Sequence, residues 1–180
     1  IHTEGITRIT PEDMEYARVM GMSIKLLATS RKLSEDSYYA VVAPFLVGKN
    51  NPLYSVNDVY NGIFVHGNVL GDAMFYGSGA GKLPTASAVV ADVVDEAKHL
   101  HENMPNEWND QPLPLADPDQ VSGRFFVRVQ TTDLSLIRSV FGTIEQIQVP
   151  KAEGETGFVT AQMTLGQYKA KAAEIKAEIL

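Results

Sequence analysis

The sequence predicts an α+β protein, in which a mixed sheet with helices packed on one face is followed by a smaller domain with the order βαββα. Short apolar runs bounded by turn residues recur in both parts and are typical of strands. A glycine-rich segment leads directly into a long amphipathic helix near the middle of the chain. A proline-rich stretch, residues 102–122, then separates the two parts and predicts a linker.

Composition excludes several classes of protein. A length of 180 residues allows one or two domains with their own cores. The net charge of −7 argues against nucleic acid or an anionic membrane as the main partner, and no apolar run is long enough to span a bilayer. The absence of cysteine fits a cytoplasmic protein. Because the chain begins at Ile1 rather than Met, we expect it to be a piece of a longer protein.

A helix-capping motif and alternating apolar residues predict the first helix and the first strands. Thr10-Pro11-Glu12-Asp13 matches the [ST]xx[DE] helix start, and the helix is expected to end at Gly21. Pro44 suggests an edge position or a bulge in its strand. Gly67-Asn68 suits a tight hairpin turn. Strands are predicted at residues 1–9, 23–30, 38–47, 62–66 and 69–76.

The hairpin leads into a loop with glycine at every second position, Gly77, Gly79 and Gly81. Such a backbone can adopt positive φ and approach another molecule closely, because no Cβ intervenes. Pro84 fits the first turn of the following helix, where Thr85 and Ser87 are expected to satisfy free N–H groups. Apolar residues then form a continuous stripe at helical spacing: Ala86, Val90, Val93, Ala97 and Leu100.

Spacing alone leaves two interpretations of this loop open. A glycine loop before a helix N-terminus is a general site for anions and phosphates. However, GxGxG differs from the GxGxxG of dinucleotide-binding folds, and no acidic residue follows in a second strand about 20 positions later. A tight structural turn explains the same three glycines equally well.

The complete string distinguishes these interpretations, because GSGAGKLPTASAVVAD at residues 77–92 resembles the GxGAGxxPTASAVxxD signature of homoserine dehydrogenases. Further pieces match in the same order: EGI at residues 4–6, the segment MGMSIKLLA, P-x-L-V at residues 44–47, and NPLYSVNDVYNGIFV. The resemblance implies that residues 1–101 are the C-terminal part of the catalytic and dimerisation domain. It also implies a homodimer, and a nucleotide-binding domain against which the glycine-loop helix packs.

The resemblance implies an NAD- or NADP-dependent interconversion of L-homoserine and L-aspartate 4-semialdehyde, on the route to threonine and methionine. The catalytic lysine and the acidic substrate residues of this family precede the EGI strand, so no catalytic residue is assigned here and the fragment is expected to be inactive alone. The predicted cofactor-binding residues, on the nicotinamide side, are Gly77, Gly79, Ala80, Gly81, Pro84 and Thr85. Glu4 is a weaker substrate-binding candidate, because an edge-strand carboxylate in solvent explains it better.

Other polar residues have simpler explanations than catalysis. Lys25 could contact an anion but fits the outer face of a strand, and His66 fits a turn better than a general base. His99 and His101 point to different sides of a helix, so no metal site is predicted. Trp108, in the linker, is expected to pack against a neighbouring domain.

The last part, residues 123–180, resembles an ACT domain, a small ligand-sensing module with a ferredoxin-like βαββαβ plan. Its predicted elements are the strands RFFVRVQT, EQIQV and GFVTAQMT and the helices 134–141 and 165–180. The last strand is missing, so we expect a truncated regulatory or dimer-forming domain. ACT domains carry D-x-P-G-x-L at the first turn, where this chain has Asp133-Leu134-Ser135-Leu136, so the effector site is expected to be degenerate.

A second hypothesis belongs to another class: a non-catalytic regulatory or amino-acid-binding module that keeps the glycine loop only as a turn. The two hypotheses differ in whether the longer protein carries a nucleotide-binding domain ahead of Ile1.

Overall fold

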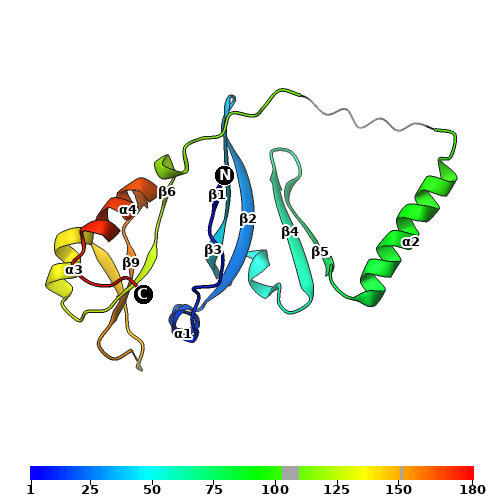
Figure 1. Cartoon of the computed structure of the whole chain (residues 1–180). Coiled ribbons are helices and arrows are strands. Elements are labelled where there is room, and N and C mark those ends of the chain that lie inside the picture. Colours follow the sequence, from blue (N-terminus) through cyan, green and yellow to red (C-terminus); the bar gives the residue numbers. More distant parts are fainter. Residues whose placement is uncertain (103–109, 151) are drawn as a thin grey trace. The chain divides into compact units, whose positions relative to one another are not determined.

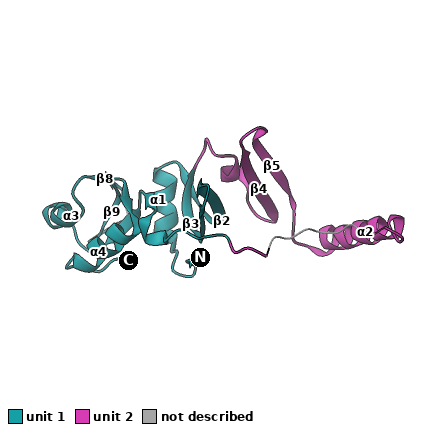
Figure 2. Cartoon of the chain, turned by 90° about the horizontal axis from the view of Figure 1, so that it is seen from above, with its two compact units in different colours: residues 1–47, 113–180 teal, residues 48–112 magenta. Residues whose placement is uncertain are grey.

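The computed structural model describes residues 1–102, 110–150 and 152–180, and it has an α+β fold with several small sheets (Figure 1). The described residues form two compact units (Figure 2). Unit 1 consists of residues 1–47 and 113–180, and unit 2 of residues 48–112. The predicted division at residues 101 and 122 rests on the family resemblance and on the proline-rich composition of residues 102–122, and it stays a prediction.

The N-terminal part of unit 1 is a three-stranded sheet with one helix. Its order is β1-β3-β2, and β1 lies parallel to β3. Thr10 and Asp13 form the predicted capping box, which fixes where the helix begins. Because β1 pairs only with Val41 and Val42, Pro44 lies beyond that pairing in the middle strand. The elements are β1 (His2–Thr3), α1 (Pro11–Val19), β2 (Met22–Ser34) and β3 (Ser37–Gly48).

The C-terminal part of unit 1 has a second antiparallel sheet, in the order β7-β9-β8. Two shorter strands, β6 and β10, pair with each other, and a short 3-10 helix η2 precedes them. The elements are η2 (Pro118–Gln120), β6 (Ser122–Gly123), β7 (Phe126–Val129), α3 (Leu134–Phe141), β8 (Ile144–Ile147), β9 (Thr156–Thr160), β10 (Met163–Thr164) and α4 (Leu165–Glu174).

One face of the β7-β9-β8 sheet packs against α3 to form a closed apolar core. Phe158 at the centre of β9 is fully buried, and its ring meets that of Phe141 at 5.1 Å between centroids. The buried members of this core are Val127, Val129, Ile137, Val140, Phe141, Phe158 and Ile175.

The prediction of a helix over residues 165–180 is wrong in its second half. The helix ends at Glu174, Ile175 is extended, and Ile179 bridges Val129 in the antiparallel sense. Burial alternates along this segment, because Ile175, Ala177 and Ile179 pack against the core while the residues between them are exposed. That two-residue period is the period of an extended chain. The end of the chain thus lies beside β7, where the sequence predicted no strand.

Unit 2 contains a hairpin and a long helix. Its elements are η1 (Pro52–Ser55), β4 (Tyr60–Gly67), β5 (Gly71–Ser78) and α2 (Lys82–Lys98). The predicted turn at Gly67-Asn68 is wrong, because Gly67 pairs with Gly71 and residues 68–70 form the loop. Gly71 has a φ of 76°, which a three-residue hairpin loop requires at its end. Val69, predicted to be in the strand, is therefore in the loop and 92% exposed.

Part of the predicted linker is extended beside β3. Tyr38 donates its N–H to the carbonyl of Pro114 at 3.0 Å, and Ala116 donates to the carbonyl of Tyr38 at 2.7 Å. Leu115 consequently forms a parallel bridge with Tyr38. The prediction for Trp108 lies outside the described residues.

Candidate functional site

The glycine loop connects the end of β5 to the start of α2. The register of the hairpin sets Gly77 opposite Asn61 and Ser78 opposite Tyr60, so the start of β4 lies alongside the loop. The rings of Tyr60 and Tyr76 stack with their centroids 4.9 Å apart. Paired strands on one side and a 17-residue helix on the other hold the short connection between them.

A Cβ at Gly79 would meet the side-chain amide of Asn61, an exposed residue that would have to move to make room. Asn61 is not among the residues that the sequence pattern predicts for the site. The predicted two-residue turn at Gly67-Asn68 sets residue 58 opposite Gly77, whereas the observed register, with Gly67 paired to Gly71, sets Asn61 there.

Gly81 is required for a different reason. Its φ of 118° lies in a region that residues with a side chain rarely adopt. Gly77, by contrast, has open space where a Cβ would lie, with no atom within 4 Å. The loop thus has one glycine whose side chain would displace Asn61, one that its backbone conformation requires, and one with open space where a side chain would lie.

The start of α2 has backbone donors without a side-chain cap. Gly81 is the N-cap residue, and within the described residues no side chain caps this helix. The prediction that Thr85 and Ser87 satisfy these groups is wrong, because the capping side chain normally comes from the N-cap residue, which here is glycine. Pro84 has no N–H, and the N–H of Thr85 donates to the carbonyl of Gly81 at 3.1 Å. The N–H groups of Lys82 and Leu83 precede the first intrahelical bond, as at any helix start.

Glu4 lies just after β1 in unit 1. Its N–H donates to the carbonyl of Val42 at 2.7 Å, and its carboxylate lies 2.7 Å from the Nε2 of His2. The side chain is exposed. A role for Glu4 in substrate binding stays a prediction.

The remaining candidates make local contacts. His66 pairs with the carboxylate of Asp72 across the hairpin, and the Nδ1 of His99 contacts the carbonyl of Asp95 at 2.9 Å. Among the residues that the structure describes, no group of three or more potential ligands could hold a metal ion. In the same residues, no helix combines the length and the apolar character needed to cross a membrane.

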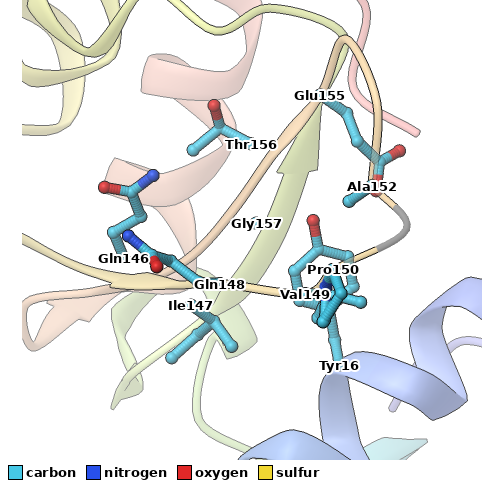
Figure 3. Close-up of a pocket in the computed structure, with 10 residues that line it drawn as sticks. All are labelled: Tyr16, Gln146, Ile147, Gln148, Val149, Pro150, Ala152, Glu155, Thr156 and Gly157. Atoms are coloured by element: carbon cyan, nitrogen blue, oxygen red, sulfur yellow. The ribbon is translucent and has the colours of Figure 1, made fainter.

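A cavity of about 430 Å³ lies in unit 1, beside β8 and β9 (Figure 3). Tyr16 from α1 and Glu155, just before β9, contribute its polar wall together with Gln146 and Gln148. None of the predicted site residues lines it.

These features define the class of protein, an α+β protein with a glycine-rich strand-to-helix connection as its candidate binding element. The family model for homoserine dehydrogenase matches residues 1–94. The chain therefore belongs to the homoserine dehydrogenase family.

Curated relatives carry the same name. The homoserine dehydrogenase of Lactococcus lactis is 32% identical over 170 residues, which cover 88% of this chain and 40% of the relative. That of Corynebacterium glutamicum is 39% identical over 139 residues, covering 74% of this chain and 31% of the relative. The chain thus spans well under half the length of these relatives.

Solved structures extend the similarity to the C-terminal part. A homoserine dehydrogenase from Thiobacillus denitrificans has a TM-score of 0.77 and 26% identity over 98% of this chain and 46% of that protein. The S. aureus homoserine dehydrogenase at pH 7.5 has a TM-score of 0.70 and 25% identity over 98% of this chain and 44% of its own. The fold of residues 113–180 is therefore shared with these enzymes, and not only the region that the family model matches.

Proposed function

We propose that this chain is part of a dehydrogenase that interconverts L-homoserine and L-aspartate 4-semialdehyde with NAD or NADP, in the synthesis of threonine and methionine. Relatives named homoserine dehydrogenase, at 32% and 39% identity, support this proposal. The observation that carries it is the geometry of the loop from Gly77 to Gly81, where Gly81 has a positive φ and a side chain at Gly79 would displace Asn61.

The loop residues fit a dinucleotide in two respects. The missing side chains let a ligand approach the backbone of Gly77 closely, and the uncapped start of α2 presents the N–H groups of Lys82 and Leu83 to an anionic group. When bound, the dinucleotide supplies the hydride acceptor or donor. This chain's own contribution is to bind and orient that cofactor through Gly77, Gly79, Ala80, Gly81, Pro84 and Thr85.

The catalytic proton donor belongs, in this proposal, to a part of the enzyme that precedes Ile1. The present residues would then be inactive without that part. We further propose that the complete enzyme is a cytoplasmic homodimer, and that the apolar stripe of α2 packs against the nucleotide-binding domain. The exposure of Val90 and Val93, 61% and 62%, supports the last point.

For residues 123–180 we propose an ACT-like regulatory domain. The element order β7-α3-β8-β9-α4 supports this, as does the sheet order β7-β9-β8 with Ile179 beside Val129, which is a ferredoxin-like arrangement. Asp133 uses its carboxylate to accept hydrogen bonds from the N–H groups of Ser135 and Leu136, at 2.9 and 3.1 Å. A turn that caps its own helix supports the proposal that the effector site is degenerate.

The loop is tested in the complete enzyme. Gly79→Val and Gly81→Val should each lower homoserine oxidation by about 100-fold or more, because small displacements at a reacting site cost that much. Gly48→Ala is the control, since a Cβ there meets no atom within 4 Å and its backbone is not strained. Cofactor binding is measured separately by NADPH fluorescence. Full activity in both valine variants would remove the loop from the site.

The same preparation tests the alternative of a non-catalytic module. A complete protein that folds but oxidises no homoserine with either NAD or NADP would contradict the enzyme proposal and favour that alternative. Isothermal titration with threonine tests the second domain, because binding in the micromolar range would contradict a degenerate effector site.

A further inference from the structure

The second face of the β7-β9-β8 sheet is covered by α1, from the other end of the chain. Val127 and Val129 belong to the core, so Phe126 and Arg128 alternate onto the opposite face. There the ring of Tyr16, from α1, lies 5.3 Å from the ring of Phe126 between centroids. Tyr16 is fully buried by this contact.

Strand β9 is shaped to receive that helix. Gly157 is the register partner of Arg128, and a Cβ at Gly157 would collide with the ring of Tyr16. A glycine in the interior of a strand often marks such a close approach. The contact of α1 with this sheet therefore depends on a specific feature of the C-terminal domain.

Arg128 fixes the first turn of α1 directly. Its Nη1 donates to the Oγ1 of Thr10 and to the Oδ1 of Asp13, both at 2.9 Å. Its Nε and Nη2 donate to the two carboxylate oxygens of Glu155 at 3.2 and 2.7 Å. Thr10 and Asp13 are the two residues of the capping box, so one guanidinium, 6% exposed, holds the start of the helix.

Arg128 keeps its charge and Tyr16 keeps its proton over a wide pH range. Burial alone would lower the pKa of Arg128, but its hydrogen bonds with Glu155 and Asp13 outweigh burial and raise the pKa. Burial, followed by the charge of Glu155, raises the pKa of Tyr16 to about 12, so its hydroxyl stays neutral. The cavity of Figure 3 borders the cluster at Tyr16 and Glu155.

We propose that Arg128 is a positioning residue of the dehydrogenase: through Thr10 and Asp13 it holds α1, and with it β2, in the arrangement that the catalytic part requires. Strand β2 begins only three residues after α1 ends, and the two elements pack together. The C-terminal domain thus supports the sheet of the N-terminal part. This inference rests on the dehydrogenase function proposed above.

The experiment compares Arg128→Met with Arg124→Met in the complete enzyme. Arg124 is the control, because its ion pair with Glu145 at 2.6 Å is exposed on both sides, and its other hydrogen bond, to the carbonyl of Thr160 at 3.1 Å, joins it to β9 and not to α1. Hydrogen exchange is followed in α1 and in the core helix α3, and kcat and KM for homoserine are measured. We expect Arg128→Met to speed exchange in α1 but not in α3, and to lower kcat/KM by between about 2-fold and 30-fold. Arg124→Met should change neither.

Two further variants keep the test decisive. Arg128→Lys should recover only part of kcat/KM, because one ammonium group cannot reproduce a bidentate guanidinium. Glu155→Gln weakens the second ion pair of Arg128 without touching the capping box of α1, and it replaces Arg128→Met if that variant does not fold.

Faster exchange in α1 with unchanged kcat and KM would overturn the positioning role, as would unchanged exchange in α1. A complete wild-type enzyme without homoserine oxidation would instead refute the proposed function. In that case, exchange in α1 would still show whether Arg128 holds the helix.

Discussion

The C-terminal part of unit 1 and the described residues of unit 2 differ in whether their apolar side chains are buried. Residues 126–175 bury a complete core, in which Phe158 and Ile137 have no exposed surface. Among the described residues of 48–112 none is buried, although α2 and the hairpin carry many apolar side chains. The first region buries its apolar side chains within itself, whereas those of the second are exposed to solvent.

The difference indicates where each region obtains its stability. A closed core stabilises itself by removing apolar surface from water. An amphipathic helix with an exposed stripe gains most of its stability from a surface on which it packs. In the proposed enzyme, α2 obtains that surface from the nucleotide-binding domain.

The largest effect is expected from truncating the core. Phe158→Ala removes a fully buried ring from the centre of β9, where it contacts Phe141, and should lower the free energy of unfolding by about 3–5 kcal/mol. Urea denaturation followed by far-UV circular dichroism, with hydrogen exchange in α3, measures this change. A loss below about 1 kcal/mol would mean that the core is not closed as described.

The contact of α1 with the sheet predicts a smaller effect that depends on pH. The pKa of Tyr16 is 10.0 in the unfolded chain and about 12 in the fold, so the fold favours the neutral hydroxyl. Below pH 10 the hydroxyl of Tyr16 is neutral in both the folded and the unfolded chain, and its full contribution to the free energy of unfolding is present. Between pH 10 and 12 the unfolded chain ionises first, and the free energy of unfolding should fall by about 3 kcal/mol.

Tyr16→Phe is the control for this prediction, since it cannot ionise while other tyrosines titrate as before. The stability of the wild type should fall more steeply than that of Tyr16→Phe when both are unfolded in urea at pH 9, 10, 11 and 12. Parallel curves would contradict the burial of the hydroxyl.

The smallest effect is expected on the exposed face of α2. Val93→Ala should change the stability of the present chain by less than about 0.5 kcal/mol, because Val93 is exposed and alanine favours the helix slightly. In the complete enzyme the same change should cost about 1.5 kcal/mol, since two buried carbon groups would be lost. Equal effects in both proteins would contradict packing of α2 on another domain.

Local rules predicted those elements that local interactions determine. The capping box of Thr10 and the helix over residues 134–141 agree with the structure, because both depend on side chains within one or two turns. The helix predicted over residues 165–180 is too long, since Ala, Lys and Glu favour helix whereas Ile175 and Ile179 pack on a core that the local sequence does not show.

In the candidate site, too, the local features could be predicted from the sequence, whereas the contacts between distant residues could not. The positions of Gly77, Gly79 and Gly81 could be recognised from their spacing and from the family signature. The obstruction at Gly79 could not, because it comes from Asn61 across the hairpin. The contacts of Arg128 with α1 join residues 115 and 118 positions apart, and no local pattern predicts such a pair.

That separation has a consequence for how the protein is made. Helix α1 leaves the ribosome well before its partner strands, and at about 5–20 residues per second the delay before Arg128 follows Asp13 is about 6–23 seconds. Throughout this interval Tyr16 has no Gly157 on which to pack, and all of residues 48–112 are synthesised between the two halves of unit 1. The contacts of Tyr16 and Asp13 with the β7-β9-β8 sheet therefore form only after the last third of the chain has emerged.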